Sequence, residues 1–155
     1  MVFITNRTQG DVTRRAELAR KGIANMTDTE LAEWLAPSKG AYNYTDLNRV
    51  EEAVEKLTSY LVALDRGDGL YPTRKWTAND VPNTVDMQRY IANIKMIRNA
   101  LPELHHIMPQ APASMVNLTY EGANAIEEIL SHAMQYVESR IQTFPFSGEI
   151  YGGEV

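Results

Sequence analysis

The stretch from Ala41 to Arg66 constrains the fold of this 155-residue chain most strongly. Its apolar residues recur at alternating steps of three and four, the spacing that places side chains along one face of a helix. They are Leu47, Val50, Val54, Leu57, Leu61 and Leu64. Charged residues such as Arg49, Glu55 and Lys56 lie between them, so the opposite face can remain in water. The pattern predicts an amphipathic helix that must bury its apolar face against another element.

Two later stretches repeat this spacing. The first is expected to run from near Thr84 to Leu101, where Pro102 ends it. The second opens at Thr119 and ends before Pro145. Their apolar residues are Met87, Tyr90, Ile91, Ile94, Ile97 and Leu101 in the first, and Ile126, Leu130, Ala133, Val137, Ile141 and Phe144 in the second. The sequence therefore predicts a mainly α fold, a helical bundle of three long amphipathic helices whose neighbours cross at about 20°.

Short helices are expected before the first long one. Thr8 and Asp11 resemble an N-cap with an acidic first turn, and Gly22 is placed to end that helix. Thr27 and Glu30 form a capping box that starts a second short helix. The apolar faces are Val12, Ala16 and Ala19 in the first helix, and Leu31, Trp34 and Leu35 in the second. We expect the tryptophan to anchor the second short helix against the bundle.

The connections after the first two long helices are interpreted as ordered loops. Residues 66–83 are rich in glycine, proline, asparagine and aspartate. Tyr71 and Trp76 are expected to hold this loop on the bundle, because a loop without apolar anchors has nothing to offset its ordering entropy. The tripeptide from Arg66 to Asp68 is interpreted as a helix end plus a turn and not as an adhesion signal. Prolines make residues 102–118 a crossover loop.

The whole chain, residues 1–155, is expected to form a single domain, since this length suffices to bury a hydrophobic core. Its two ends differ in character from the helices. Residues 1–7 contain the apolar run from Val2 to Ile4, and residues 145–155 space apolar and aromatic side chains among glycines. We interpret both as extended arms that can dock on a neighbouring subunit or pair within one molecule. Loosely packed chain ends are the competing interpretation.

Composition excludes several classes of protein. The chain has no cysteine, which rules out disulfides, thiolate metal sites and cysteine nucleophiles. Its net charge is -5 and its fifteen basic residues are scattered, so nucleic acid is not an expected partner. No apolar run is long enough to span a membrane, and no signal peptide is recognisable at the start. We therefore expect synthesis in the cytoplasm and no membrane partner.

The residues that could carry chemistry form no known catalytic pattern. His105 and His106 are adjacent and point in different directions, whereas Glu128 and His132 can meet on one helix face. No glutamate has a histidine three residues after it, so a di-iron bundle lacks its ligands. Phosphate-binding loops, dinucleotide fingerprints, serine-hydrolase elbows and zinc-protease motifs are also missing. The sequence thus predicts no enzyme, no cofactor, no catalytic residue and no metal site.

Aromatic and apolar residues outside the three stripes are the candidates for contact with a partner. Tyr42 and Tyr44 flank the start of the first long helix, where they either cover the helix entry or form an exposed aromatic patch. The candidate interface residues are Phe3, Tyr42, Tyr44, Trp76, Phe146, Ile150 and Tyr151. They are the sequence's prediction for an assembly surface.

Several stretches resemble a family of small uncharacterised proteins encoded by prophages of Gram-positive gut bacteria. The stretches are GAYNYTDLNRVEEAVEKL, ITNRTQGDV, DMQRYIANI, PQAPASM, LTYEGANAIE and SGEIYGGE, together with the segment around Trp76. The likeness covers most of the chain, but none of these motifs is a catalytic signature. What the resemblance implies is a bacteriophage virion protein associated with the tail or baseplate, made in the host cytoplasm.

Three hypotheses of function follow. The leading one is a non-enzymatic virion structural protein of the tail or baseplate region, acting through protein–protein interaction as a homo-oligomer and with other phage tail proteins. The second is a receptor- or glycan-binding module of a tail fibre, with Tyr42, Tyr44, Tyr71 and Trp76 as its surface. The third is a small phage enzyme or host-takeover factor, which would need His105 or His132 in a pocket beside a carboxylate.

Overall fold

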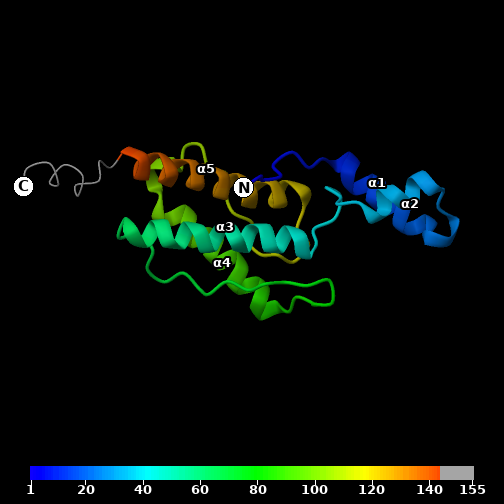
Figure 1. The fold of residues 1–155 in the computed structure, drawn as a ribbon, viewed down its shortest axis with the longest axis horizontal. Coiled ribbons are helices and arrows are strands. Elements are labelled where there is room, and N and C mark those ends of the chain that lie inside the picture. The colour runs from blue at the N-terminus through cyan, green and yellow to red at the C-terminus, as the bar shows by residue number, and fades with distance from the viewer. Residues whose placement is uncertain (144–155) are drawn as a thin grey trace, which may run out of the picture.

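The computed structural model describes residues 1–143, which contain five α-helices and no β-strand. The mainly α class is therefore confirmed. The helices are α1 (Gln9–Lys21), α2 (Asp28–Leu35), α3 (Tyr44–Ala63), α4 (Thr84–Ala100) and α5 (Tyr120–Thr143), with short 3-10 helices at Ile23–Asn25 and Pro102–Leu104 (Figure 1). Phe144, Pro145 and the predicted arm 145–155 lie outside the described residues. No helix within residues 1–143 is long and apolar enough to cross a membrane.

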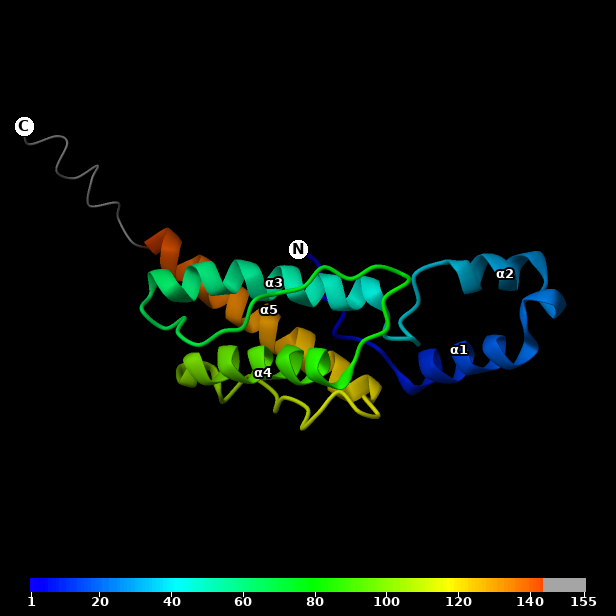
Figure 2. The same cartoon turned by 90° about the horizontal axis from the view of Figure 1, so that it is seen from below.

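The helices α3, α4 and α5 pack against one another around one hydrophobic core. We call these three helices, with the loops between them, the helical body. All three begin at the same end of the body, so residues 64–83 and 101–119 run back along its length (Figures 1 and 2). The core residues on α3 are Leu47, Val50, Ala53, Val54, Leu57 and Leu61. The predicted apolar stripe of α3 is thus confirmed as far as Leu61, and Leu64 is half-buried at the helix end.

Most of the predicted apolar residues of α4 and α5 lie in the core, whereas Met87 and Ile141 are half-buried. On α4 the buried apolar residues are Tyr90, Ile91, Ile94 and Ile97, followed by Leu101 just past the helix end. On α5 they are Ala123, Ile126, Ile129, Leu130, Ala133, Met134 and Val137. Burial of this many side chains, at about 1.5–3 kcal/mol for each large one, is the main force that holds the helical body together.

The loop between α3 and α4 is held by one aromatic side chain and by two asparagines. Trp76 is 2% exposed, as predicted, and Asn48 of α3 bonds both its backbone N–H (2.7 Å) and its carbonyl (2.8 Å). Tyr71 is 51% exposed, so its expected role as an apolar anchor is wrong. Asn93 of α4 fixes Tyr71 through its backbone instead, with bonds of 2.8 and 3.0 Å. Nothing in the sequence indicated that Asn93, which lies among the apolar residues of α4, would bond the backbone of this loop.

The end of α3 confirms the interpretation of the RGD tripeptide as helix end plus turn. The backbone N–H of Arg66 donates to the carbonyl of Leu61 (2.8 Å), which closes the last turn of the helix. Its guanidinium donates to Glu103 at the start of the crossover loop (2.5 Å). Arg66 therefore links two connections of the helical body.

The helices α1 and α2 form a hairpin that extends away from the helical body (Figures 1 and 2). The guanidinium of Arg15 lies 3.6 Å from the centre of a Trp34 ring and donates to the Trp34 carbonyl (2.8 Å). Trp34 therefore anchors α2 to α1, and the expected anchor against the bundle is wrong. Leu35 is 73% exposed. Each helix of the hairpin buries little, since Leu18 is the buried residue of α1 and α2 has none.

The caps of the hairpin follow the sequence closely, whereas its apolar face does not. Thr8 with Asp11 and Thr27 with Glu30 both form complete capping boxes, and Gly22 ends α1 at φ 75° with its N–H on the Leu18 carbonyl. The predicted stripe of α1 is wrong in part, because Ala16 and Ala19 are exposed and Leu18 is the buried residue of this helix.

Gly40 fixes the base of the hairpin. A Cβ atom at this position would lie 2.0 Å from the backbone oxygen of Asp11, a clash that no side-chain rotation relieves. We expect Gly40→Ala to lower the free energy of unfolding by about 1–3 kcal/mol, because the hairpin must shift to admit the methyl group. Urea unfolding followed by circular dichroism measures this loss.

Gly10→Ala is the matched control. A Cβ atom at Gly10 would meet only the Thr8 Oγ1 at 3.5 Å, which is an ordinary contact. Since alanine has a higher helix propensity than glycine, this variant should be as stable as the original chain or slightly more so. Equal losses for both variants would contradict the role given to Gly40.

Candidate functional site at the base of the hairpin

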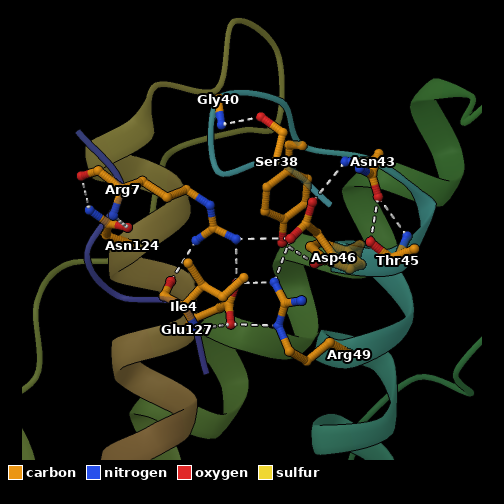
Figure 3. A network of polar contacts seen from close by, with 12 residues as sticks. Ile4, Arg7, Ser38, Gly40, Asn43, Thr45, Asp46, Arg49, Asn124 and Glu127 are labelled. Atoms are coloured by element: carbon orange, nitrogen blue, oxygen red, sulfur yellow. Dashed lines mark hydrogen bonds and ion pairs between the residues drawn. The ribbon is translucent and has the colours of Figure 1, made fainter. Parts of the chain in front are cut away.

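A network of buried charges joins the N-terminal segment to α3 and α5 (Figure 3). The Arg7 side chain is 2% exposed, and its Nη2 donates to Asp46 Oδ1 (3.0 Å) and Glu127 Oε1 (2.6 Å). Arg49 donates to the same two carboxylates at 2.5–2.8 Å. The two guanidinium groups and the two carboxylates balance in charge, which is the condition under which charges tolerate burial.

Local sequence places Asp46 and Arg49, whereas Glu127 comes from a distant helix. Asp46 is the third residue of α3, where it also accepts from the N–H of the N-cap residue Asn43 (3.0 Å). Arg49 follows three residues later, so its side chain lies above the same face of the helix. Glu127 belongs to α5 and is fully buried. Asp46 therefore takes part both in the cap of α3 and in a long-range ion pair with Arg7.

Residues 1–7 have no regular secondary structure and contact α5 of the same molecule. The N–H of Ile4 donates to Glu127 Oε2 (2.6 Å), and Arg7 Nη1 donates to the Ile4 carbonyl (2.5 Å). Asn124 bonds both the backbone N–H (3.0 Å) and the carbonyl (2.9 Å) of Arg7. The N-terminal arm is therefore tied to α5 by backbone and side-chain contacts.

The ionisation of the groups around the network favours its intact form. Burial alone would lower the pKa of Arg49, but hydrogen bonds to Glu127 and Asp46 outweigh burial and raise that pKa above its ordinary value. The hydroxyl groups of Tyr42 and Tyr90 lie 2.6 Å apart, and burial raises the pKa of both. Each oxygen of Asp46 and Glu127 accepts a hydrogen bond. The two carboxylates therefore hold the N-terminal segment against α3 and α5.

A second buried polar cluster holds Trp76. The indole Nε1 donates to Glu51 Oε1 (3.2 Å), and Arg89 of α4 donates to both oxygens of Glu51. Glu51 is 3% exposed, although the spacing of α3 placed it among charged residues expected in water. The sequence carried no signal of this burial, because the partners lie 25 and 38 residues away.

The histidines do not converge on a common centre. His132 Nε2 lies 3.7 Å from Glu128 Oε1, so these two residues meet on one helix face as their spacing indicated. The His105 Nε2 lies 2.8 Å from the backbone oxygen of Arg98, and His106 is exposed. Within residues 1–143, no group of three or more histidine, aspartate or glutamate side chains is arranged to hold a metal ion.

Glu103 is a carboxylate with a strongly shifted ionisation. It accepts hydrogen bonds from the Tyr136 hydroxyl and from Arg66, both at 2.5 Å. The bond from Tyr136 lowers the pKa of Glu103 most. Burial opposes this shift, but the added hydrogen bond from Arg66 helps to bring the pKa to about 2. This side chain joins α5 to the ends of α3 and α4.

The Glu103 contacts predict an acid-sensitive contribution to stability. A carboxyl group with a lowered folded-state pKa stabilises the fold above its unfolded pKa and loses that effect as the pH falls towards its folded pKa. We expect the melting temperature of the original chain to fall more between pH 5 and pH 2 than that of Glu103→Gln. Circular dichroism melts across this range measure the difference.

Glu55→Gln, at an exposed residue of α3, is the control for the loss of one negative charge. The melting temperature of Glu55→Gln should fall between pH 5 and pH 2 by as much as that of the original chain. Parallel curves for Glu103→Gln and the original chain would show that Glu103 contributes no such effect.

The described candidate interface residues lie in different environments. Phe3 and Tyr42 are partly buried against the core, Tyr44 is 42% exposed, and Trp76 is inside the core. These four therefore do not form one exposed aromatic surface. The glycan-binding hypothesis assumed an exposed surface formed by Tyr42, Tyr44, Tyr71 and Trp76. Phe146, Ile150 and Tyr151 lie outside the described residues.

The structure exposes other apolar side chains that the sequence did not single out as contact residues. Ile23, between the two helices of the hairpin, is 59% exposed, and Leu35, the last residue of α2, is 73% exposed. On the helical body Val62 of α3 is 59% exposed. Sequence periodicity missed Ile23 and Leu35 because it cannot tell a helix packed on the body from one that projects.

Comparison of the chain with protein-family models, with curated proteins and with solved structures finds no match.

Proposed function

We propose that this chain is a non-enzymatic structural protein of a phage virion, located in the tail or baseplate region and acting through protein–protein assembly. The observation that supports this proposal is the projecting hairpin. Its base is held by Gly40 and lies beside the buried charge network, while Ile23 and Leu35 present apolar side chains to solvent. A projection with exposed apolar residues on a well-anchored base suits contact with a partner protein.

In this proposal α3, α4 and α5 form a three-helix bundle that serves as the rigid part of the subunit. The assembly includes both further copies of the chain and other tail proteins. The protein is made in the host cytoplasm and resides in the virion. Such a role uses no cofactor, no nucleic acid and no membrane.

The proposal is tested on particles. Induction of a prophage that encodes this chain, followed by mass spectrometry of purified virions, should find the chain at a fixed ratio to known tail proteins. The double variant Ile23→Glu and Leu35→Glu should be absent from particles, because two carboxylates on the hairpin would be desolvated in the contact. A chain found only in the cell lysate would overturn the proposal.

Val62→Glu is the matched control, since it places a carboxylate on an exposed apolar residue of the helical body. It should enter particles as the original chain does. Size-exclusion chromatography with light scattering gives a second measurement, in which the original chain should form an oligomer. Loss of particle entry in the control as well would place the contact on the body and not on the hairpin.

The receptor- or glycan-binding hypothesis has less support in its original form. Tyr44 and Tyr71 are exposed, but Trp76 is not. A glycan site would therefore require another location on the molecule.

A further inference from the structure

A pocket of about 470 Å³ lies beside the first three turns of α4, and we call it the α4 pocket. It is bounded by the end of the loop before α4, by one face of the helix, and by residues 113–116 of the crossover loop. Its lining is mainly apolar, with Met87, Ile91, Met115 and Val116 as the larger side chains. Ile91 belongs to the hydrophobic core, and flexible methionine side chains adapt to the shape of an incoming group.

The surface around the α4 pocket is also apolar. Val116, in the pocket wall, is exposed, and so are Val81 and Val85, which are adjacent in the chain to lining residues. Exposed apolar side chains that surround an apolar pocket mark a site of interaction with another protein segment. This surface is separate from the exposed residues of the hairpin.

One positive charge stands at this pocket without a negative partner. Among the described lining residues, Lys95 is the one that carries a charge. Its Nζ donates to the carbonyl of Ala113 (2.8 Å), and no carboxylate within residues 1–143 pairs with it. An ammonium group has three donors, so Lys95 can still bind a carboxylate. The complement of the α4 pocket is therefore a peptide that carries a carboxylate next to apolar side chains.

The chain itself contains such a peptide. Glu149 directly precedes Ile150 and Tyr151, two of the candidate interface residues, in the stretch 144–155 outside the described residues. We infer that residues 144–151 of one copy dock in the α4 pocket of a second copy. The apolar pair fills the pocket, and Glu149 forms an ion pair with Lys95. The inference rests on the proposed assembly role and names the site through which copies of the chain meet.

The direction of α5 favours a second copy over the same copy. α5 ends at Thr143, at the end of the helical body where α3 also ends, whereas α4 begins at the other end (Figures 1 and 2). Glu149 is six residues beyond Thr143, so it can lie at most about 20 Å away. Folding back along α5, which is about 36 Å long, would use nearly all of this reach. A second copy placed head to tail requires no such return, and contacts of this kind build rings or filaments.

The test exchanges the two charges of the expected ion pair in the full chain. Size-exclusion chromatography with light scattering, over a series of concentrations, measures self-association. Lys95→Glu and Glu149→Lys should each weaken it at least about tenfold, because each places like charges opposite one another. An equimolar mixture of the two variants should associate as the original chain does, since every contact between unlike copies again joins opposite charges. Val116→Glu, which adds a carboxylate to the exposed pocket wall, should weaken association without removing Lys95.

Lys75→Glu is the matched control, because Lys75 is an exposed lysine that does not line the α4 pocket. It should associate as the original chain does, and circular dichroism checks that all variants are folded. A monomeric original chain, equal weakening by the control, or no effect of either charge reversal would overturn the inference. So would a mixture that stays dissociated while the double variant of Lys95→Glu and Glu149→Lys associates, because the segment would then dock in its own copy. Entry into particles is measured separately, so a chain that associates through this pocket but is absent from virions would contradict the proposed function alone.

Discussion

Replacing Glu127 by glutamine should lower the free energy of unfolding by about 3–5 kcal/mol, the usual loss when one partner of a buried ion pair is removed. Glu127 is fully buried and accepts from Arg7, from Arg49 and from the N–H of Ile4. The amide has nearly the same shape, but without the carboxylate charge two guanidinium groups would share only Asp46. The network would then hold a net positive charge.

Equilibrium unfolding in urea, followed by circular dichroism, measures this loss. Glu128→Gln is the matched control, because the neighbouring glutamate has a 45% exposed side chain and meets only His132 at 3.7 Å among the described ion pairs. Its change should stay within about 0.5 kcal/mol. If the two variants unfolded at the same urea concentration, the network would not anchor the arm as described.

The Glu127 variant should also release the N-terminal arm. Limited proteolysis should cleave within residues 1–8 faster in Glu127→Gln than in Glu128→Gln, because the contacts of Ile4 and Arg7 are lost together. Equal cleavage rates would mean that Asn124 alone holds the arm.

Trp76→Ala is expected to cost about 3–5 kcal/mol, as large-to-small substitutions of buried aromatic residues do. The Trp76 side chain is 2% exposed, so its truncation leaves a cavity in the core. Trp76 lies in a loop, where no helical hydrogen bonds hold the backbone in place after the ring is removed. The substitution also removes the indole N–H that donates to the buried Glu51. Both the cavity and the lost hydrogen bond destabilise the helical body.

Tyr71→Ala in the same loop is the control for Trp76→Ala. The tyrosine side chain is 51% exposed, and Asn93 holds this residue by its backbone, which the substitution retains. The stability should change by less than about 0.5 kcal/mol. Thermal unfolding of the two variants side by side decides between a loop anchored by Trp76 and a loop anchored by both aromatic residues.

The sequence by itself determined the features that depend on neighbours three or four positions apart. The stripe from Leu47 to Leu61, the N-cap at Thr8 and the capping box of Thr27 were confirmed. These signals are local, because the helical repeat and the first-turn hydrogen bonds involve residues close in the chain. The mainly α class followed from them.

Only the tertiary structure decided which charges are buried and which helices project. Arg7 and Glu127 are 120 residues apart, and Trp76 and Glu51 are 25 apart, so no periodic pattern could pair them. The same physics explains the error over Trp34: an apolar helix face shows that a partner exists and not which partner it is. Contacts between distant residues are selected by the packing of the whole chain. They joined Arg7 and Glu127 to the local pair of Asp46 and Arg49 and set where the hairpin projects.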